Sequence, residues 1–386
     1  MNFITEHLLS LILFVPAIAA VIMLFLPEGE NKLARWFAFG ASLIPFALSL
    51  IVWFNFRSSL PGFQFEESSV WYAAIGSNFH LGVDGLSLTM VLLTTLLTPL
   101  AILASFSISD RVKWYMMLFL FLETGMLGVF MALDLLIFFV FWEVGLVPMY
   151  FLINQWGSAN RNYASLKFLI YTMGGSLGLL LAIQLLGVLF GTFDLVTLYE
   201  RWNALPSGEM LLGMSVSTVK TIAFWAFVIA FAIKVPVWPF HTWLPDAHTE
   251  APTAGSMILA GVLLKLGAYG FLRLILPLYP VEAHNFAGVL ALLATAAIVF
   301  GALSSYAQTD FKRLVAYSSV NHMGFVVLGI AAAAFAAGTP DATIALNGAI
   351  LQMFNHGLSA AGMFFLVGVI YERTHTRDLE KFGGLF

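Results

Sequence analysis

The sequence is dominated by apolar runs that are long enough to cross a lipid bilayer. A membrane-spanning helix needs ~20 predominantly apolar residues, and runs near that length recur along the whole chain with only short polar breaks. Hydrophobic residues make up 60 % of the 386-residue chain, charged residues make up 10 %, and the mean hydropathy is +0.92. This composition excludes a water-soluble domain and predicts an all-α polytopic membrane protein.

Eleven such runs are present, and each predicts one transmembrane helix. They cover residues 8–26, 33–56, 84–106, 114–131, 133–153, 163–190, 218–244, 252–275, 285–305, 315–337 and 343–371. Cysteine is absent, which excludes disulfides, cysteine-ligated iron–sulfur clusters and thiolate catalysis in this chain. The net charge of -4 is small and suggests no nucleic-acid partner.

Four ionisable residues lie deep inside these apolar runs, and they are the first candidates for function. They are Glu123, Glu143, Lys234 and Lys265. Each charged group at mid-membrane costs about 2.5–3.5 kcal/mol on insertion scales, so such residues are rarely without a role. Two acids and two lysines in these positions indicate a pathway for protons or another cation.

The seventh run carries the clearest backbone signal, because prolines interrupt it at positions 236, 239, 245 and 252. Each proline removes a backbone donor and disfavours helix in the residue before it. Within a membrane, an interrupted helix is tolerated only where protein or a hydrated cavity satisfies the freed carbonyls. We therefore predict a broken helix with Lys234 just before the first break. The alternative is a simple kink with a snorkelling lysine.

The two buried acids differ in their surroundings. Glu143 lies near the middle of FFVFWEVGLVPMYF, with Gly145 and Pro148 just beyond it. We predict that it belongs to the charge pathway, and the alternative is a structural, hydrogen-bonded glutamate. Glu123 lies in LFLFLETGMLG and is a weaker candidate, for which a structural or lipid-facing role is the alternative.

Lys265 lies centrally in GSMILAGVLLKLGAYGFL, whose small residues permit close helix contact. We predict that it relays protons. His322 and His356 lie within later runs, and histidine titrates close enough to neutrality to carry protons. Each of these histidines could equally be a hydrogen-bonded packing residue.

Further titratable residues border the seventh run. His241 and His248 lie close to Asp246 and Glu250. This group could feed an inner funnel, and the less favoured alternative is a metal site.

The distribution of Lys and Arg predicts the orientation, because basic loops stay on the cytoplasmic side. An outside N-terminus places eleven basic residues on the inner side and four on the outer side, and the two buried lysines complete the 17. The inner set is Lys32, Arg35, Arg111, Lys113, Arg161, Lys167, Lys312, Arg313, Arg373, Arg377 and Lys381, and the outer set is Arg57, Arg201, Lys220 and Arg273. The C-terminus of this chain is then cytoplasmic.

Two of the outer connections are long enough to have structure of their own. Residues 61–83 alternate apolar and polar positions, which favours a small surface β-hairpin. The stretch LVTLYERW at residues 195–202 favours a short interfacial helix before Pro206. Both are predicted to pack against neighbouring segments rather than to carry chemistry.

At this point the motifs resemble one family strongly, namely subunit M of bacterial NADH-quinone oxidoreductase (respiratory complex I), an antiporter-like membrane subunit. The resemblance extends over essentially the whole chain. The stretches that carry it are HLGVDGLSLTMVLLTTLLTPLAILAS, DLLIFFVFWEVGLVPMYFLI, KVPVWPFHTWLPDAHTEAPTAGSMILAGVLLKLGAYG, SSYAQTDFKRLVAYSSVNHMGF and HGLSAAGMFFLVGVIYERTHTRDL. The proline-rich stretch is specific for the antiporter-like superfamily, and the last one favours subunit M.

The resemblance implies a fold of fourteen helices with two inverted five-helix units. It implies that Glu143 and Lys234 form a buried ion pair, that Lys265 continues the path, and that His322 and His356 lead on toward a charged residue in a broken twelfth helix. That residue is absent here, so we expect the chain to be incomplete at its C-terminal end. The expected division is an N-terminal part at 1–110, a first five-helix unit at 111–275 and a partial second unit at 276–386.

The resemblance also implies the activity, which is proton transfer coupled to NADH oxidation and quinone reduction. This chain has no GxGxxG fingerprint and no haem-ligand motif, so NADH, FMN, iron–sulfur clusters and quinone are expected in partner subunits. The expected partners are other membrane subunits, especially neighbouring antiporter-like ones, in a bacterial inner membrane. One alternative is a subunit of a multi-subunit cation/proton antiporter. A non-transporting membrane scaffold is the other, and it fits poorly with four costly buried charges.

Overall fold

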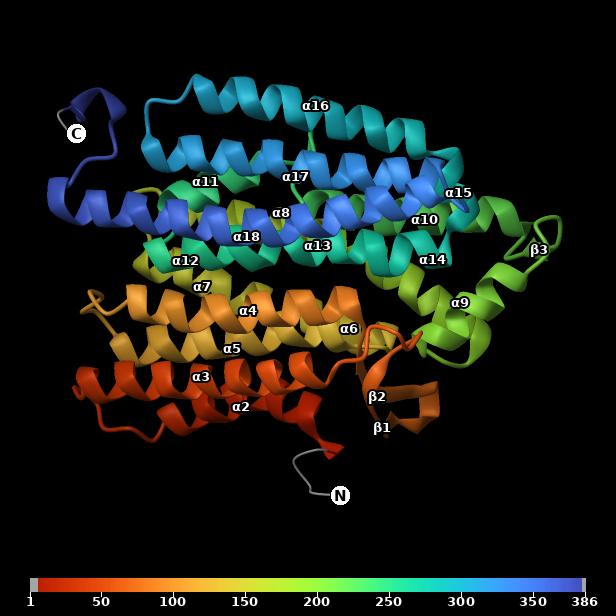
Figure 1. Ribbon diagram of the computed structural model, residues 1–386, viewed down its shortest axis with the longest axis horizontal. Coiled ribbons are helices and arrows are strands. Elements are labelled where there is room, and N and C mark those ends of the chain that lie inside the picture. Colours follow the sequence, from red (N-terminus) through yellow and green to blue (C-terminus); the bar gives the residue numbers. More distant parts are fainter. Residues whose placement is uncertain (1–5, 384–386) are drawn as a thin grey trace.

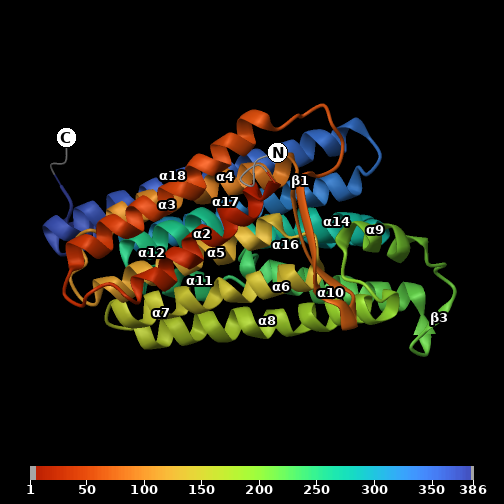
Figure 2. The ribbon, with the colours of Figure 1, turned by 90° about the horizontal axis from the view of Figure 1, so that it is seen from below.

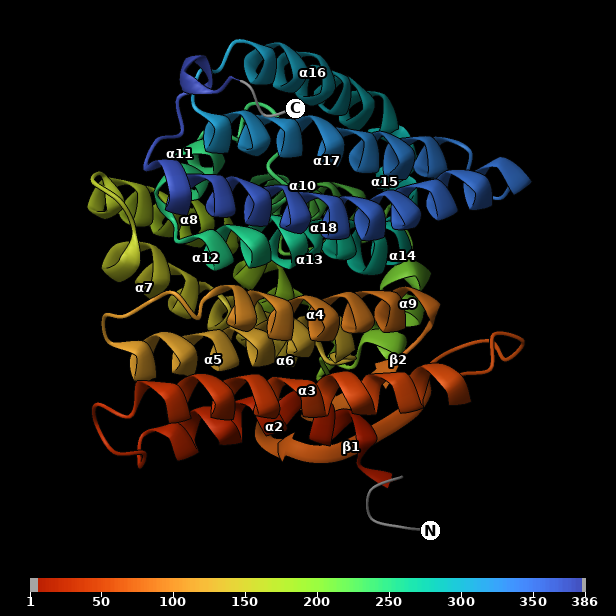
Figure 3. The ribbon, with the colours of Figure 1, turned by 60° about the vertical axis from the view of Figure 1, so that its left-hand side comes forward.

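The computed structural model describes residues 6–383 as an elongated bundle of helices that run nearly side by side (Figure 1). Figure 3 shows them in rows, from α2 and α3 at one edge, through α4 and α5, to α17 and α16 at the other. The long helices are α2 (Leu8–Met23), α3 (Asn31–Asn55), α4 (Gly85–Ala104), α5 (Val112–Met131), α8 (Arg161–Phe190), α10 (Val216–Lys234), α16 (Ala287–Tyr306), α17 (Phe311–Phe335) and α18 (Pro340–Thr374). The polytopic all-α prediction is confirmed.

Within the described residues, ten helical spans are long and apolar enough to cross a membrane. The first predicted span is present as α2, which is apolar but has only 16 residues. At 1.5 Å per residue, α2 is about 24 Å long, which is short of the ~30 Å hydrocarbon core. The other ten predicted runs each correspond to one of the long spans.

Three of these spans are not regular helices. Residues 135–156 are divided at Gly145 into α6 (Leu135–Val144) and α7 (Leu146–Trp156). After α10 ends at Lys234, the chain continues as α11 (Trp243–Glu250), so the predicted proline break is confirmed. The next span joins α12 (Thr253–Ile258), α13 (Leu264–Gly270) and α14 (Leu276–Leu278) through two π-helical segments at Leu259–Leu263 and Phe271–Ile275.

The bundle has two chemically distinct ends. One, here called the hairpin end, carries β1 (Gln64–Tyr72) and β2 (Ser77–Val83), the short helix α9 (Leu195–Ala204), a small ribbon of β3 (Met210–Leu211) and β4 (Met214–Ser215), and α15 (Pro280–Asn285). The opposite end, here called the C-terminal end, carries α11 and the last described residues. The predicted hairpin is confirmed, and so is a short helix before Pro206.

Local interactions attach the hairpin to the bundle. β1 and β2 are antiparallel, with Gln64 opposite Val83 and Tyr72 opposite Ser77, and Figure 2 shows β1 lying across the bundle near α9. His80 of β2 contacts Asp194, the N-cap of α9, at 3.0 Å and Glu66 of β1 at 3.1 Å. The hydrogen bond to Asp194 raises the pKa of His80 above its ordinary value, although partial burial opposes this. The hairpin is therefore held against α9 most firmly at mildly acidic pH.

The eleven basic residues predicted for the inner side all lie in turns and helix ends of the C-terminal end, among them Lys32 at the start of α3 and Arg373 in the last turn of α18. We therefore propose that the C-terminal end faces the cytoplasm. The absence of cysteine allows a direct test of this orientation.

Single cysteines placed at Glu28 and at Ser59 should label differently in intact spheroplasts. Both residues are exposed, and they lie at opposite ends of the bundle. A membrane-impermeant maleimide should modify Ser59→Cys but reach Glu28→Cys only after the membrane is permeabilised. The reverse pattern would invert the topology.

Candidate functional site

Lys265 lies at the centre of the bundle and is fully buried. Its ammonium donates to the carbonyl of Ala260 at 2.6 Å and lies 2.6 Å from Nδ1 of His356. Ala260 belongs to the π-helical segment Leu259–Leu263, directly before Lys265. π-Segments are rare and often occur at functional sites, because they change the direction of backbone carbonyls. The π-helical segment here includes the acceptor that the buried cation uses.

Two histidines from later helices continue from Lys265. His356 of α18 is 3 % exposed, and its Nε2 has no hydrogen-bond partner among the described residues. The ring of His322 on α17 lies 5.7 Å from the His356 ring, centroid to centroid. His322 is exposed at the bundle surface and contacts Gln352 at 3.2 Å. The structure thus brings together Lys265, His356 and His322, three of the residues predicted from sequence.

Glycines allow the helices of this site to approach one another closely. A Cβ on Gly357, next to His356, would lie 3.0 Å from the carbonyl oxygen of Gly261. A Cβ on Gly267 would lie 2.8 Å from the carbonyl oxygen of Phe231 and 3.0 Å from Cβ of Lys234. No residue larger than glycine fits these contacts without movement of a backbone. The predicted close packing around Lys265 is therefore present.

Lys234 is the last residue of α10 and is 2 % exposed. Its ammonium lies 5.0 Å from the centroid of the Trp142 ring, which gives a cation–π contact. Trp142 is the residue before Glu143, and the Glu143 carboxylate is close enough to interact electrostatically with Lys234.

The predicted Glu143–Lys234 ion pair, however, is not a direct contact. Among the described residues no carboxylate oxygen lies within 4.0 Å of the Lys234 ammonium, and Oε1 of Glu143 is buried without a hydrogen-bond partner. The cause is local: the ammonium faces the Trp142 ring, and Glu143 lies at the end of α6, where the helix is interrupted. The two charges are neighbours that remain separate in this structure.

Glu123 of α5 is fully buried, so the lipid-facing alternative is wrong for this residue. Neither of its carboxylate oxygens has a hydrogen-bond partner among residues 6–383. The span that carries Glu143 packs tightly against α5, since a Cβ on Gly125 would lie 2.7 Å from Cα of Gly145. A buried, unpaired carboxyl beside the interrupted span needs water or a proton to satisfy it.

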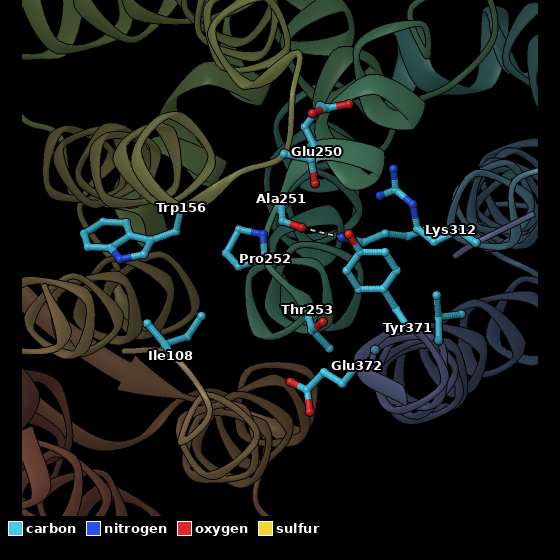
Figure 4. A pocket seen from close by; sticks show the side chains of 13 residues that line it. Ile108, Trp156, Glu250, Ala251, Pro252, Thr253, Lys312, Tyr371 and Glu372 are labelled. Carbon is cyan, nitrogen blue, oxygen red and sulfur yellow. Dashed lines mark hydrogen bonds between the residues drawn. The ribbon is translucent and has the colours of Figure 1, made fainter. Parts of the chain in front are cut away.

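A cavity of about 200 Å³, lined by both apolar and charged residues, opens at the C-terminal end (Figure 4). Its charged lining residues are Glu250, Lys312, Glu372 and Arg377. Lys312, 6 % exposed, reaches across it and donates to the carbonyl of Ala251, as the dashed line in Figure 4 marks. We call this cavity the vestibule.

His248 lies on α11, whose last residue, Glu250, lines the vestibule. It is fully buried, its ring stacks on Phe364 at a centroid distance of 4.4 Å, and neither ring nitrogen has a described partner. It is within electrostatic range of both Lys312 and Lys265. Buried polar atoms are nearly always satisfied, so these two nitrogens call for a partner beyond the described side chains.

The other members of the predicted inner group have separate roles. Asp246 forms ion pairs with Lys167 at 2.7 Å and with Arg313 at 3.4 Å, and the His241 ring lies against Tyr317. Within the part of the chain that the structure describes, no three His, Asp or Glu side chains are grouped so that they could hold a metal ion. The geometry therefore gives no support to the metal-site alternative.

Sequence reasoning underestimated the burial of several ionisable groups, because it treated them as loop or interface residues. Lys312 and Arg273 were counted only for orientation, yet they are 6 % and 8 % exposed. His248 was placed at the border of a span. Arg273 had a usable signal, since it lies within the apolar stretch FLRLILPL.

The family can now be stated. A model described as "NADH:quinone oxidoreductase/Mrp antiporter, TM" matches residues 132–386, and the chain belongs to this family. Subunit M of NADH-quinone oxidoreductase from Rhodobacter capsulatus is 44 % identical over 387 residues, which cover 98 % of this chain and 73 % of that protein. The resemblance to subunit M is thereby confirmed.

Solved structures agree with this assignment. One chain of respiratory complex I from Thermus thermophilus with bound NADH has a TM-score of 0.83 at 28 % identity, and the match covers 98 % of this chain and 74 % of that one. One chain of the Mrp complex from a Dietzia species has a TM-score of 0.78 at 24 % identity, covering 97 % of this chain and 38 % of that one. The second likeness shows a shared fold alone. The antiporter-like fold is confirmed.

Replacing Gly267 by alanine should destabilise the protein, because the new methyl group would collide with the Phe231 carbonyl and with Lys234. Overpacking of this kind costs about 1–3 kcal/mol. The matched control is Gly174→Ala on α8, where nothing lies within 4 Å of the added Cβ, and alanine should be neutral or favourable there. The unfolding midpoints of the two variants would be compared in an SDS titration. Equal midpoints would contradict the close packing at Gly267.

Proposed function

We propose that the chain acts as the proton-translocating membrane subunit M of an NADH-quinone oxidoreductase. The observation that carries this conclusion is the buried Lys265–His356 contact, found in a chain that belongs to the oxidoreductase/antiporter family. A lysine ammonium in contact with an imidazole nitrogen is a proton donor beside an acceptor. Redox chemistry belongs to partner subunits, where NADH, FMN, iron–sulfur clusters and quinone are expected.

The transfer step follows from the two nitrogens of His356. Nδ1 accepts the hydrogen bond from Lys265, so a proton passing from the ammonium arrives at Nδ1. The imidazolium then releases a proton from Nε2, which has no protein partner to hold it. His322, whose ring is 5.7 Å away, is the next protonatable group in that direction. Histidine thereby passes a charge across its ring without moving far.

Lys234 and Glu143 supply the switch in this proposal. Trp142 holds the Lys234 ammonium near the break in the seventh span, within range of the Glu143 carboxylate. A small movement at either interrupted helix would bring the two charges together or separate them. Either change would alter the free energy of protonating Lys265. Redox energy from partner subunits would bias the movement as a coupling free energy. Glu123, beside the same interrupted span, is proposed as a further protonatable group.

The vestibule is the proposed site of proton uptake. It is open at the C-terminal end, and the many basic residues at this end support the proposal that it faces the cytoplasm. Protons would pass from Lys312 and Glu250 to His248 and then to Lys265, with ordered water bridging the gaps. In this proposal the chain lies in a bacterial inner membrane beside neighbouring antiporter-like subunits, with its N-terminus outside and its C-terminus cytoplasmic.

The alternative, a subunit of a multi-subunit cation/proton antiporter, is weaker. The likeness to the Mrp complex is one of fold, whereas the relatives with about two fifths of their residues in common are oxidoreductase subunits. The expected three-part division of the chain and the inverted pairing of its units remain proposals.

Lys265→Arg should abolish most redox-driven proton pumping while the complex still assembles. Arginine keeps the positive charge but does not release its proton in proteins. We expect pumping to fall at least about tenfold, which corresponds to ~1.4 kcal/mol on the barrier. Acidification of proteoliposomes after NADH addition would measure this, with NADH oxidation by an artificial acceptor verifying the redox partners.

The matched control is Lys220→Arg, because Lys220 is a buried lysine of α10 at the hairpin end that has no part in the proposed path. It should pump like wild type. An assembled Lys265→Arg complex with the wild-type rate would exclude obligatory deprotonation of Lys265.

His248→Phe should slow proton pumping without disturbing the packing. Phenylalanine preserves the stacked ring on Phe364 but removes both nitrogens, so the proposed relay from the vestibule to Lys265 is interrupted. His284→Phe is the control, since His284 also stacks on a phenylalanine, Phe335, but lies at the hairpin end. Initial rates of NADH-driven pumping would compare the two, and equal rates would remove His248 from the path.

A further inference from the structure

Arg273 lies on the same helical span as Lys265, eight residues closer to the hairpin end. At 1.5 Å per residue, the two cations are about 12 Å apart along the axis. The most apolar part of this span is entirely buried, and Arg273 itself is 8 % exposed. A buried arginine on the span of the proposed proton relay is costly, so it calls for a functional explanation.

The donors of Arg273 are engaged by a compact cluster. Its Nη2 donates to Oδ1 of Asp84 at 2.6 Å and to Oγ of Ser87 at 3.0 Å, and its Nε donates to the hydroxyl of Tyr269 at 3.0 Å. The guanidinium lies 4.8 Å from the centroid of Phe63, which precedes the hairpin strand β1. The segment before β1, the start of α4 and the span of Arg273 itself therefore meet at this one cation.

Tyr269 lies between Lys265 and Arg273 along the span. It lies one turn beyond Lys265, is fully buried, and donates its only hydroxyl proton to the carbonyl of Phe130 at 2.9 Å. A backbone carbonyl cannot pass a proton onward, and an arginine does not release one. Ser87 also contacts the Tyr269 hydroxyl at 3.1 Å, so what opposes an excess proton in this cluster is the fixed positive charge of Arg273.

Asp84 stabilises the cation at its outer side. Burial alone would raise the pKa of Asp84, but the Arg273 guanidinium offsets this and holds the pKa below its ordinary value. Asp84 therefore remains ionised, as the N-cap of α4 that accepts from the Ser87 amide. The pair lowers the cost of keeping a permanent positive charge inside the bundle.

We propose that Arg273, Tyr269 and Asp84 form the outer proton barrier of this subunit. The barrier closes the hairpin end of the Lys265 span, so that Lys265 exchanges protons with the vestibule and with His356 but not directly with the outer side. Fixed arginine charges exclude protons from pores in other membrane proteins by the same electrostatics. This inference rests on the proposed proton-translocating function.

The two ends of the span differ in the way that a barrier requires. Toward the C-terminal end, His248 has two unpartnered nitrogens and the vestibule is open. Toward the hairpin end, neither Tyr269 nor Arg273 has a buried side-chain nitrogen or oxygen without a hydrogen-bond partner. On the first side His248 therefore lacks a protein partner for either nitrogen, whereas on the second side the Tyr269 hydroxyl and the Nε and Nη2 of Arg273 are engaged. The unpartnered hydroxyl of Tyr279 lies beyond Arg273, where the span ends.

The test is the passive proton leak of the reconstituted complex. The whole oxidoreductase carrying Arg273→Met in this subunit is placed in proteoliposomes, and proton entry under a potassium diffusion potential is followed without NADH. Removing a unit charge about 12 Å from the path, at an effective dielectric of about 20, should raise the leak about tenfold. Arg273→Lys keeps the charge but can release its proton, so it should raise the leak less.

Lys220→Met is the matched control. Lys220 is also 8 % exposed, also lies near the hairpin end and has Glu282 as its electrostatic neighbour, but it is on α10 rather than on the Lys265 span. Removing the Lys220 ammonium leaves the Glu282 carboxylate behind, just as removing the Arg273 guanidinium leaves Asp84. The proton leak of Lys220→Met should nevertheless stay at the wild-type value.

Two results would overturn the proposal. One is a wild-type leak in an assembled Arg273→Met or Arg273→Lys complex. The other is a loss of NADH-driven pumping without any leak, which would make the cluster an exit path instead. Because the leak is measured without turnover, its outcome is independent of the pumping test on Lys265, so failure of the barrier and failure of the proposed function can be told apart.

Discussion

The structure depends on the cost of holding the Lys265 ammonium at the centre of an apolar bundle. The side chain is fully buried there, so its charge must be satisfied by hydrogen-bond partners or released with a proton. The π-segment before Lys265 supplies the Ala260 carbonyl, and His356 supplies a nitrogen that can either accept a hydrogen bond or take the proton. The buried ammonium thus has one partner that only accepts a hydrogen bond, the Ala260 carbonyl, and one that can also take its proton, His356.

Interrupted helices and glycines make this arrangement possible. The breaks after Lys234 and at Gly145 place polar backbone inside the bundle, which a membrane tolerates only where it is covered by protein or water. Gly267 and Gly357 let neighbouring backbones approach the Lys265 span closely enough to exclude lipid from it. The same close packing makes the site sensitive to small movements, since tightly packed elements respond to displacement by shifting between discrete arrangements.

The charged residues at the two ends of the bundle differ in their access to solvent. At the C-terminal end, Glu250, Lys312, Glu372 and Arg377 line an open cavity, and His248 leads inward from it. At the hairpin end, Arg273 is enclosed by Asp84, Ser87, Tyr269 and the ring of Phe63. A proton carrier needs access on one side at a time, and this asymmetry agrees with a state that is open toward the C-terminal end.

The sequence by itself determined the spans, the proline break after Lys234, the hairpin at 61–83 and the short helix before Pro206, because span length, proline chemistry and strand alternation act locally. It also identified Lys265, His322 and His356 as protonatable groups inside spans. Only the tertiary structure decided that Lys265 meets His356, 91 residues away, that Lys234 faces Trp142 instead of Glu143, and that Arg273, Lys312 and His248 are buried. The reason is physical: lipid and protein interior are equally apolar, so hydropathy does not tell which face of a membrane helix meets a neighbouring helix and which meets lipid.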